Sequence, residues 1–336
     1  MVGKSDKLAE EKAIQFVRGT FSSLLCDSLS LHNVAAPLAV LDGTGINDDL
    51  NGTERPVRFP VRGVNNHPAV VVHSLAKWKR IRLMELGIPE GQGIVTDMRA
   101  LRPDEDLGPM HSLFVDQWDW EQRITPGQYS ISYLKTTVGR VYEALKMTEK
   151  RIQMEYPWHT PVLPDRIRFI HSEDLLAMFP DCSPAEREYE AARRFGAIFL
   201  IGIGGMLSNG EPHDGRAPDY DDWSSPGENG MPGLNGDIIV WNPVLKSAFE
   251  ISSMGIRVSP EALQRQLEIR ACPERKKLLF HQMLMRNELP MSIGGGIGQS
   301  RVCMFMLRKA HISQVQVSIW PPSELQKMRE IGLEPL

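Results

Sequence analysis

The sequence predicts an α+β fold of the two-layer α/β kind, in which a mixed, mainly antiparallel β-sheet is flanked by helices. The first observation is that the predicted strands come in pairs and clusters and do not alternate strictly with helices, which favours an antiparallel sheet. The second is that 336 residues with 42% hydrophobic content can bury a large core. We therefore expect one large domain or two closely joined ones.

The first half of the chain begins with a clear helical pattern. An amphipathic helix is predicted over residues 8–31, because Ile14, Val17 and Phe21 continue with Leu24 and Leu25 into one apolar stripe. We expect this stripe to pack against the body of the protein or against a partner subunit. The elements predicted next are strands over residues 57–61, 69–72, 94–102 and 113–120, and helices over residues 75–86 and 133–156.

The second half contains a long irregular stretch between two groups of elements. Residues 205–236 are rich in Gly, Pro, Asn and Asp, and a stretch of that length is typical of a functional or a mobile loop. Before it we predict helices over residues 173–179 and 184–195 and a buried strand over residues 197–201. After it we predict strands over residues 237–241, 248–251 and 315–319, and helices over residues 260–269, 274–286 and 300–307.

Composition argues against several classes of protein. The formal net charge is -4 and the chain has no dense block of Lys or Arg, so we expect no nucleic-acid partner. The N-terminus has no apolar signal region, and no stretch approaches the ~18 apolar residues of a membrane span, so we expect a cytoplasmic protein without a membrane partner. The 4 cysteines are far apart and form no CxxC pair, which disfavours a zinc site or a disulfide framework.

The glycine-rich segment 294–301, Gly-Gly-Gly-Ile-Gly-Gln-Ser-Arg, is the most informative motif. Glycine has no Cβ, so a base or a phosphate can approach the backbone closely, and the planar guanidinium of Arg301 offers paired donors to phosphate oxygens. A plain tight turn ahead of a core helix is the alternative. A dinucleotide fingerprint would need a glycine at Arg301 and a P-loop would need Gly-Lys-Ser/Thr, so neither motif is present.

A predicted hairpin joins two strands through the acidic loop 104–106. Arg102 ends the first strand, where its guanidinium can bind a phosphate between the strands. The alternative is a surface turn in which Arg102 and the acidic residues are solvated. In the returning strand Gln117 and Asp119 share one face, whereas the aromatic residues lie on the other. The hairpin therefore predicts one polar face.

A carboxylate is predicted within a later strand. Alternation puts Glu250 and Ser252 on the same face of the sheet. Glutamate is a poor strand former and seldom sits in a strand without a partner. A Mg²⁺ ion shared with a triphosphate would supply that partner, because Mg²⁺ prefers oxygen ligands. The alternative is an ion pair with a neighbouring Arg or Lys.

Two further segments can contact charged ligands. Ser74 is a plausible helix cap, so the N-terminal amides of that helix and Lys79 can hold a carboxylate, or the basic residues can form a solvated face. Asp219, Asp221 and Asp222 cluster in the long loop. Such a cluster can bind an ammonium group or a metal, or it can be a solvated loop tip.

Taken in chain order, these segments resemble the catalytic core of class II aminoacyl-tRNA synthetases. Residues 102–119 are similar to the second motif of that class, and residues 294–301 are similar to the third. Glu250 followed by Arg257 is similar to the segment with which aspartyl-tRNA synthetases hold magnesium and read aspartate.

Six blocks in a fixed order extend this resemblance to one family. They resemble ammonia-dependent asparagine synthetases, the aspartate-ammonia ligases, and the likeness covers about residues 10–320. The chain departs from the family at its N-terminal tip, over residues 127–164 and after Trp320. The six blocks are residues 73–80, 100–106, 111–121, 217–224, 234–244 and 292–301.

The resemblance implies a single catalytic domain over residues 1–336, without a separate anticodon-binding or glutaminase domain. It implies ATP-dependent amidation of L-aspartate by ammonia to L-asparagine through a β-aspartyl-adenylate, with release of AMP and pyrophosphate, and it implies Mg²⁺ and a homodimer. Met1 precedes Val2 and not a cysteine nucleophile, which favours free ammonia over glutamine. The alternative is a catalytically silent or tRNA-charging aspartyl-tRNA synthetase-like protein, although silent relatives usually lose the motif arginines present here.

The resemblance also assigns roles to individual residues. The catalytic residues are Asp48, Arg102, Asp221 and Arg301. The aspartate-binding residues are Ser74, Lys79, Gln117, Asp119, Ser252, Ser253 and Arg257. The ATP-binding residues are Arg102, Asp237, Glu250, Gly294, Gly295, Gly296 and Arg301, and the metal ligands are Asp237 and Glu250. Asp48 or Asp221 would take a proton from ammonium or from the tetrahedral intermediate.

Overall fold

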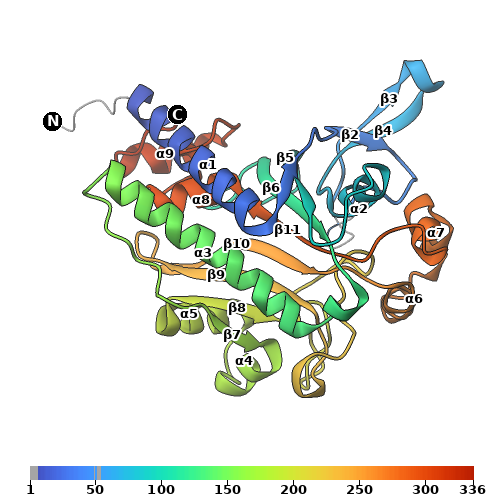
Figure 1. Cartoon of the computed structure of the whole chain (residues 1–336). Coiled ribbons are helices and arrows are strands. Elements are labelled where there is room, and N and C mark those ends of the chain that lie inside the picture. The colour runs from blue at the N-terminus through green and yellow to red at the C-terminus, as the bar shows by residue number, and fades with distance from the viewer. Residues whose placement is uncertain (1–6, 49, 51–53) are drawn as a thin grey trace.

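The computed structural model describes residues 7–48, 50 and 54–336, and one large sheet runs through it (Figure 1). The outermost pairs β1–β5 and β7–β8 are parallel, whereas the pairs between them are antiparallel. The predicted mixed, mainly antiparallel sheet is confirmed. From one edge to the other its strands are β1 (Leu31–Asn33), β5 (Gly93–Leu101), β6 (Phe114–Arg123), β11 (Ser292–Gly298), β10 (Ser247–Ile256), β9 (Asn235–Asn242), β8 (Ala197–Ile201) and β7 (Arg168–His171).

Helices α1 (Lys7–Leu29), α3 (Ile131–Glu155) and α8 (Gln299–Met306) share the apolar core of one sheet face, and Figure 1 shows α1 and α3 crossing in front of the sheet. The ring of Phe21 lies 4.7 Å from that of Trp118, between centroids. The predicted stripe of α1 is buried within the chain's own core. Of the two expected positions of the stripe, the structure shows packing against the body of the protein. The fully covered stripe residues are Ile14, Val17, Phe21, Leu25 and Leu29.

Five helices between α1 and α8 contribute no residue to this core, and the other sheet face has room for a cavity. One of them, α5, begins at Pro184 because Ser183 and Glu186 form a capping box before it. Apolar residues of α4 and α5 pack against β8 and β9, and those of α6 and α7 form a separate cluster. These helices are α2 (Ala76–Glu85), α4 (Ser172–Met178), α5 (Pro184–Phe195), α6 (Pro260–Ile269) and α7 (Leu279–Met285).

A second sheet of three strands projects from the body (Figure 1). Its order is β2 (Ala39–Leu41), β4 (His67–Val71) and β3 (Arg58–Val61), and both pairs are antiparallel. No described helix is long and apolar enough to cross a membrane. The short 3-10 helices of the described chain are η1 (Arg62–Val64), η2 (Pro126–Gln128), η3 (Glu228–Gly230), η4 (Pro273–Lys277) and η5 (Ile312–Gln314).

The structure differs from the predicted elements at several places. Residues 315–319 form no strand in the described chain, and Val315 lies in a turn. The helix predicted over 274–286 is divided into η4 and α7, because Leu278 between them has an extended backbone with ψ 150°. Helix α9 (Pro322–Glu330) and the strands β1, β2, β7 and β11 were not predicted. The long loop before β9 is packed, since Ile203 and Trp223 are buried in it.

Candidate active site

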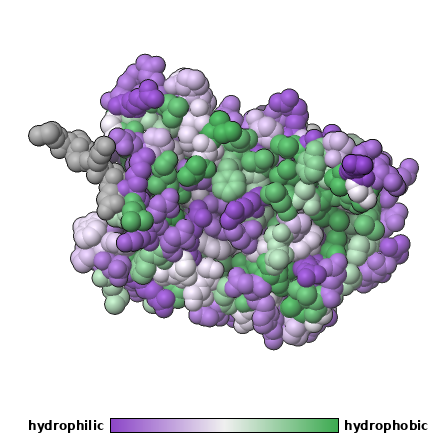
Figure 2. Space-filling model, turned by 90° about the horizontal axis from the view of Figure 1, so that it is seen from above, coloured by the Kyte–Doolittle hydropathy of each residue, from purple (hydrophilic) through white to green (hydrophobic). Residues whose placement is uncertain are grey.

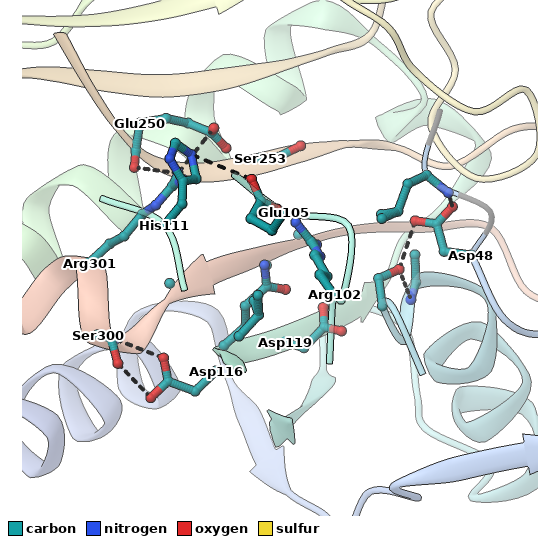
Figure 3. Close-up of a pocket in the computed structure, with 18 of the residues that line it drawn as sticks. Asp48, Arg102, Glu105, His111, Asp116, Asp119, Glu250, Ser253, Ser300 and Arg301 are labelled. Carbon is teal, nitrogen blue, oxygen red and sulfur yellow. Dashed lines mark hydrogen bonds and ion pairs between the residues drawn. The ribbon is translucent and has the colours of Figure 1, made fainter. Parts of the chain in front are cut away.

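A cavity of about 470 Å³ lies against the sheet where β6, β11 and β10 are neighbours. Its walls include the loop between β5 and β6 and the long loop before β9. In Figure 3 Glu250 and Arg301 lie at one side of the cavity and Asp48 lies at the other. Most of the predicted site residues line it, namely Asp48, Ser74, Arg102, Gln117, Asp119, Asp221, Glu250, Ser253, Arg257, Gly295, Gly296 and Arg301.

The glycines of β11 make the floor of this cavity flat. β11 lies between β6 and β10, so the tight-turn alternative for this segment is wrong. A Cβ atom on Gly296 would lie 2.2 Å from Oε1 of Gln117, and one on Gly294 would lie 2.0 Å from Oε2 of Glu121. The side chains of β6 therefore extend over β11, which only glycine permits.

Arg257 is fixed by two buried carboxylates. Its Nε donates to both oxygens of Glu121 at 3.0 and 3.1 Å, its Nη2 donates to Oε2 of Glu121 at 2.8 Å, and its Nη1 donates to Asp221. Although burial opposes it, Glu121 and Asp221 raise the pKa of Arg257. One hydrogen remains on each terminal nitrogen, so Arg257 can still bind a further carboxylate through two donors.

Asp119 faces the cavity and is held from behind by Lys79. The Lys79 ammonium is fully buried and donates to Asp119 and to the carbonyl oxygens of Trp120, at 2.8 Å, and Gly295, at 3.2 Å. The backbone N–H of Leu75, at the start of α2, donates to the other oxygen of Asp119 at 3.1 Å. The helix start and Lys79 hold a carboxylate, but it is the protein's own. The predicted direct contact of Lys79 with substrate is therefore corrected, because Lys79 lies behind Asp119.

Two arginines that line the cavity have unused donors. Arg102 donates from Nη2 to the carbonyl of His73 at 3.4 Å, and its Nε has no hydrogen-bond partner among the described residues. Arg301 donates through Nη1 to the carbonyl and the carboxylate of Glu250, both at 3.2 Å (Figure 3). Planar guanidinium groups with free donors are suited to phosphate oxygens.

A β-bulge in β10 changes which residues share the cavity face. The register with β9 shifts between Glu250 and Ser252, so strict alternation between these two residues fails. Ser253 joins Glu250 at the cavity. Ser252 is 1% exposed and lies away from the cavity, and its Oγ has no hydrogen-bond partner within the described chain. The predicted contact of Ser252 with substrate is therefore corrected, because the extra residue Ile251 displaces the alternation.

The predicted metal ligands Asp237 and Glu250 lie on neighbouring strands, and each is paired with an arginine. Arg216 donates from Nη2 to Oδ1 of Asp237 at 2.7 Å, and Arg301 pairs with Glu250. Burial, together with nearby Glu250, raises the pKa of Asp237 to about 7. The described residues contain no group of three His, Cys, Asp or Glu side chains placed for a metal. Carboxylate oxygens are ligands that Mg²⁺ prefers, and a Mg²⁺ ion held by these two residues would take its other ligands from phosphates and water.

The aspartate cluster of the long loop is buried. Asp219, Asp221 and Asp222 are 0%, 1% and 0% exposed, so the solvated-loop alternative is wrong. Asp219 accepts from the Lys77 ammonium at 2.9 Å, and Asp222 accepts from the hydroxyl of Tyr129. Asp221 is the member of the cluster that lines the cavity, and its Oδ2 has no hydrogen-bond partner among the described residues.

Asp48 lies at the far end of the cavity with both oxygens hydrogen-bonded. Oδ2 accepts from the Ser74 hydroxyl and Oδ1 accepts from the backbone N–H of Leu50, both at 3.0 Å. Burial raises the pKa of Asp48, as it does that of Asp221. The pKa of each carboxyl is therefore raised. Asp221 has one oxygen without a hydrogen-bond partner among the described residues, whereas Asp48 has none.

Three residues of the site were not predicted. Glu121 continues the alternation of Gln117 and Asp119, so a strand extended by one residue would have included it. Asp116 accepts from the backbone N–H of Ser300 at 3.0 Å and thereby holds the start of α8 beside the cavity. Arg216 lies in a loop without periodicity, and the sequence carries no signal for it.

Comparison with known proteins places the chain in one family. The family model for aspartate-ammonia ligases matches residues 8–332. The aspartate-ammonia ligase of Parabacteroides distasonis is 54% identical over 323 residues, which are 96% of this chain and 94% of that protein. The aspartate-ammonia ligase of Bacteroides thetaiotaomicron is 52% identical over 323 residues, with the same coverage of 96% and 94%.

Solved structures confirm the predicted class II aminoacyl-tRNA synthetase fold. The asparaginyl-tRNA synthetase of Pyrococcus horikoshii, solved with asparaginyl-adenylate, superposes with a TM-score of 0.69 and 14% identity over 93% of this chain and 70% of that one. The aspartyl-tRNA synthetase of Entamoeba histolytica gives 0.59 and 13% identity over 93% and 59%. Identities this low show the fold alone, whereas the family model and the relatives show that this chain belongs to the aspartate-ammonia ligase family.

Proposed function

We propose that this chain forms L-asparagine from L-aspartate, ammonia and ATP through a β-aspartyl-adenylate, with release of AMP and pyrophosphate. The observation that carries the proposal is one cavity that is lined both by Arg102 and Arg301, which have unused donors, and by the Arg257 cluster. Relatives that are 52% to 54% identical are named for this activity, whereas the tRNA synthetases share 14% identity or less. The comparisons therefore favour a ligase over a tRNA-charging enzyme.

Aspartate is bound at the end of the cavity around Arg257. The two free donors of Arg257 bind one substrate carboxylate, and Asp119 with Gln117 provides acceptors for the substrate ammonium. Ser74 and Ser253 add hydroxyl groups to the same cavity. The buried partners of these charges hold them in place, since an unpaired buried charge is costly.

ATP is bound beside Arg102 and Arg301, above the flat strand of Gly295 and Gly296. Arg102 binds the α-phosphate and Arg301 binds the other phosphates. Asp237 and Glu250 would hold Mg²⁺, which supplies charge neutralisation when bound. Attack of the substrate β-carboxylate on the α-phosphorus then needs alignment and charge neutralisation and no protein nucleophile.

Asp221 is the better placed of the two candidate proton acceptors. Ammonia attacks as a neutral molecule, so a proton must leave ammonium or the tetrahedral intermediate. Asp221 has an oxygen without a hydrogen-bond partner in the described structure, whereas both oxygens of Asp48 already accept hydrogen bonds. Burial raises the pKa of the Asp221 carboxyl, which makes its ionised form a stronger base. Because Asp221 also pairs with Arg257, the variant D221N should weaken aspartate-dependent pyrophosphate exchange, but it should reduce asparagine formation much more.

The proposed activity is tested by supplying L-aspartate, Mg-ATP and ammonium and measuring asparagine, AMP and ADP. Asparagine and AMP should appear in equal amounts. R257K keeps the positive charge without the planar fork and should lose about tenfold or more of kcat/KM for aspartate. Release of ADP, or tRNA charging without asparagine, would contradict the proposal.

We also propose that the enzyme is a cytoplasmic homodimer. Because the apolar stripe of α1 is buried, the subunit contact must use another surface. Apolar side chains are exposed on and beside the three-stranded sheet, with Leu38 61%, Leu41 44% and Phe59 39% exposed. Figure 2 shows a broad apolar area on the face seen from above. Light scattering that gives only a monomer at micromolar concentration would overturn the dimer.

A further inference from the structure

Arg216 reaches from the long loop to the two strands that carry the proposed metal ligands. Its Nη2 donates to Oδ1 of Asp237 and its Nη1 donates to Oγ of Ser253, both at 2.7 Å. Its Nε lies 3.9 Å from Oδ2 of Asp221 and has no hydrogen-bond partner in the described part of the chain. Arg216 lines the cavity, so a bound ligand would meet this guanidinium.

The position of Arg216 is set by packing. Its carbonyl accepts from Nη2 of Arg270 at 3.4 Å. Gly204 lies against it, since a Cβ atom on Gly204 would be 2.7 Å from the Cβ of Arg216. The base of the side chain is thus held by its surroundings, while its guanidinium is held by a carboxylate and a hydroxyl. A competing partner can remove the guanidinium without unfolding the loop.

The pair of Arg216 with Asp237 differs from the pair of Arg301 with Glu250. The side chains of Arg216 and Asp237 are 11% and 12% exposed, whereas that of Glu250 is 45% exposed. Water and salt screen the exposed pair much more than the buried one. Arg216 is therefore the cation that dominates at the proposed metal position.

We propose that Arg216 stays ion-paired with Asp237 in the ligand-free protein. The ion pair prevents free divalent metal ions from binding this carboxylate until a metal-nucleotide complex binds. This inference rests on the proposed function, because it takes Asp237 as a ligand of the metal bound with ATP. A guanidinium and a divalent cation cannot both contact one carboxylate oxygen without strong repulsion. Phosphate oxygens give Arg216 a new anionic partner in the same cavity, so metal and nucleotide bind together.

The test measures Mn²⁺ binding by electron paramagnetic resonance, without activity as the readout. Without nucleotide, R216Q should bind Mn²⁺ at least about tenfold more tightly than the wild type, or about 1.4 kcal/mol. R216K keeps the positive charge and should remain close to the wild type. The double variant R216Q/D237N should lose the gain, because the freed carboxylate is absent. Equal binding by R216Q and wild type, or a gain that persists without Asp237, overturns the proposal.

A measurement on the wild type covers the case in which R216Q does not fold. A non-hydrolysable ATP analogue should increase the Mn²⁺ affinity of the wild type by about tenfold or more, and an unchanged affinity overturns the proposal. Asparagine formation by the wild type separates the two inferences. If asparagine forms while R216Q leaves Mn²⁺ binding unchanged, only the role of Arg216 fails. If no asparagine forms while R216Q gains affinity, only the ligase activity fails.

Discussion

Replacing Gly294 with alanine should break the buried ion pair that fixes Arg257. A Cβ atom at this position would lie 2.0 Å from Oε2 of Glu121 and 2.5 Å from Nη2 of Arg257. Those two atoms are 2.8 Å apart, so the methyl group would enter the space of a hydrogen bond. Neither side chain can move into solvent, because Glu121 is 0% and Arg257 is 3% exposed.

The expected loss of stability follows from this burial. Breaking a buried ion pair costs about 3–5 kcal/mol, since an uncompensated charge remains inside the protein. Alanine otherwise gains about 0.5–1 kcal/mol over glycine in a regular element. The free energy of unfolding should therefore fall by about 2–4 kcal/mol. A misplacement of Arg257 by about 1 Å should lower kcat/KM for aspartate about 100-fold.

Urea unfolding and the AMP-forming assay measure the two effects of the Gly294 variant separately. G139A in α3 is the matched control, because nothing beyond the backbone of its own helix lies within 4 Å of the added Cβ; it should keep activity and gain about 0.5–1 kcal/mol of stability. G296A should keep stability but raise KM for aspartate, since its Cβ meets only the flexible end of Gln117. If G294A unfolds at the urea concentration of the wild type and keeps its kcat/KM, Glu121 and Arg257 do not meet under Gly294.

Three further predictions test the site and the fold. E121Q removes the charge that fixes Arg257 and should raise KM for aspartate about tenfold with little change in KM for ATP; equal rises would point to general damage. Burial raises the pKa of Asp237 to about 7, and metal binding needs the ionised carboxylate. The value of kcat/KM for ATP should therefore fall as pH drops through about 7. A flat pH profile in that range would contradict a role of Asp237 as a metal ligand. F21A removes a 0% exposed ring packed on Trp118 and should cost about 3–5 kcal/mol at every protein concentration. A cost that depends on concentration would place α1 in a subunit contact.

The fold was predictable wherever side chains reveal the period of the backbone. The helices predicted over residues 8–31 and 133–156 agree with α1 and α3 within two residues, because their apolar stripes are continuous. β11 gave no such signal, since glycines have no side chains to alternate. Residues 315–319 are rich in β-branched residues but have no strand beside them in the described structure, and pairing depends on distant parts of the chain.

The candidate site was predictable up to the point where two strands meet irregularly. Alternation placed Gln117 and Asp119 correctly on the cavity face, because β6 pairs regularly with β11. Alternation failed at Ser252, because β10 has a bulge where it pairs with β9. The sequence of β10 by itself gives no sign of this bulge. Arg216 could not be found either, since its place is set by packing of the loop around Gly204.

The chemistry of the site depends on which charges the protein itself already neutralises. Lys79 is occupied by Asp119, and one edge of the Arg257 guanidinium is occupied by Glu121, so neither full charge is available to a ligand. What remains in the cavity is a pair of donors on Arg257 and the little-used donors of Arg102. Donors of this kind match one carboxylate and one phosphate group held in a single cavity. An acyl phosphate mixed anhydride, which joins those two groups, is therefore the species that this arrangement is built to hold.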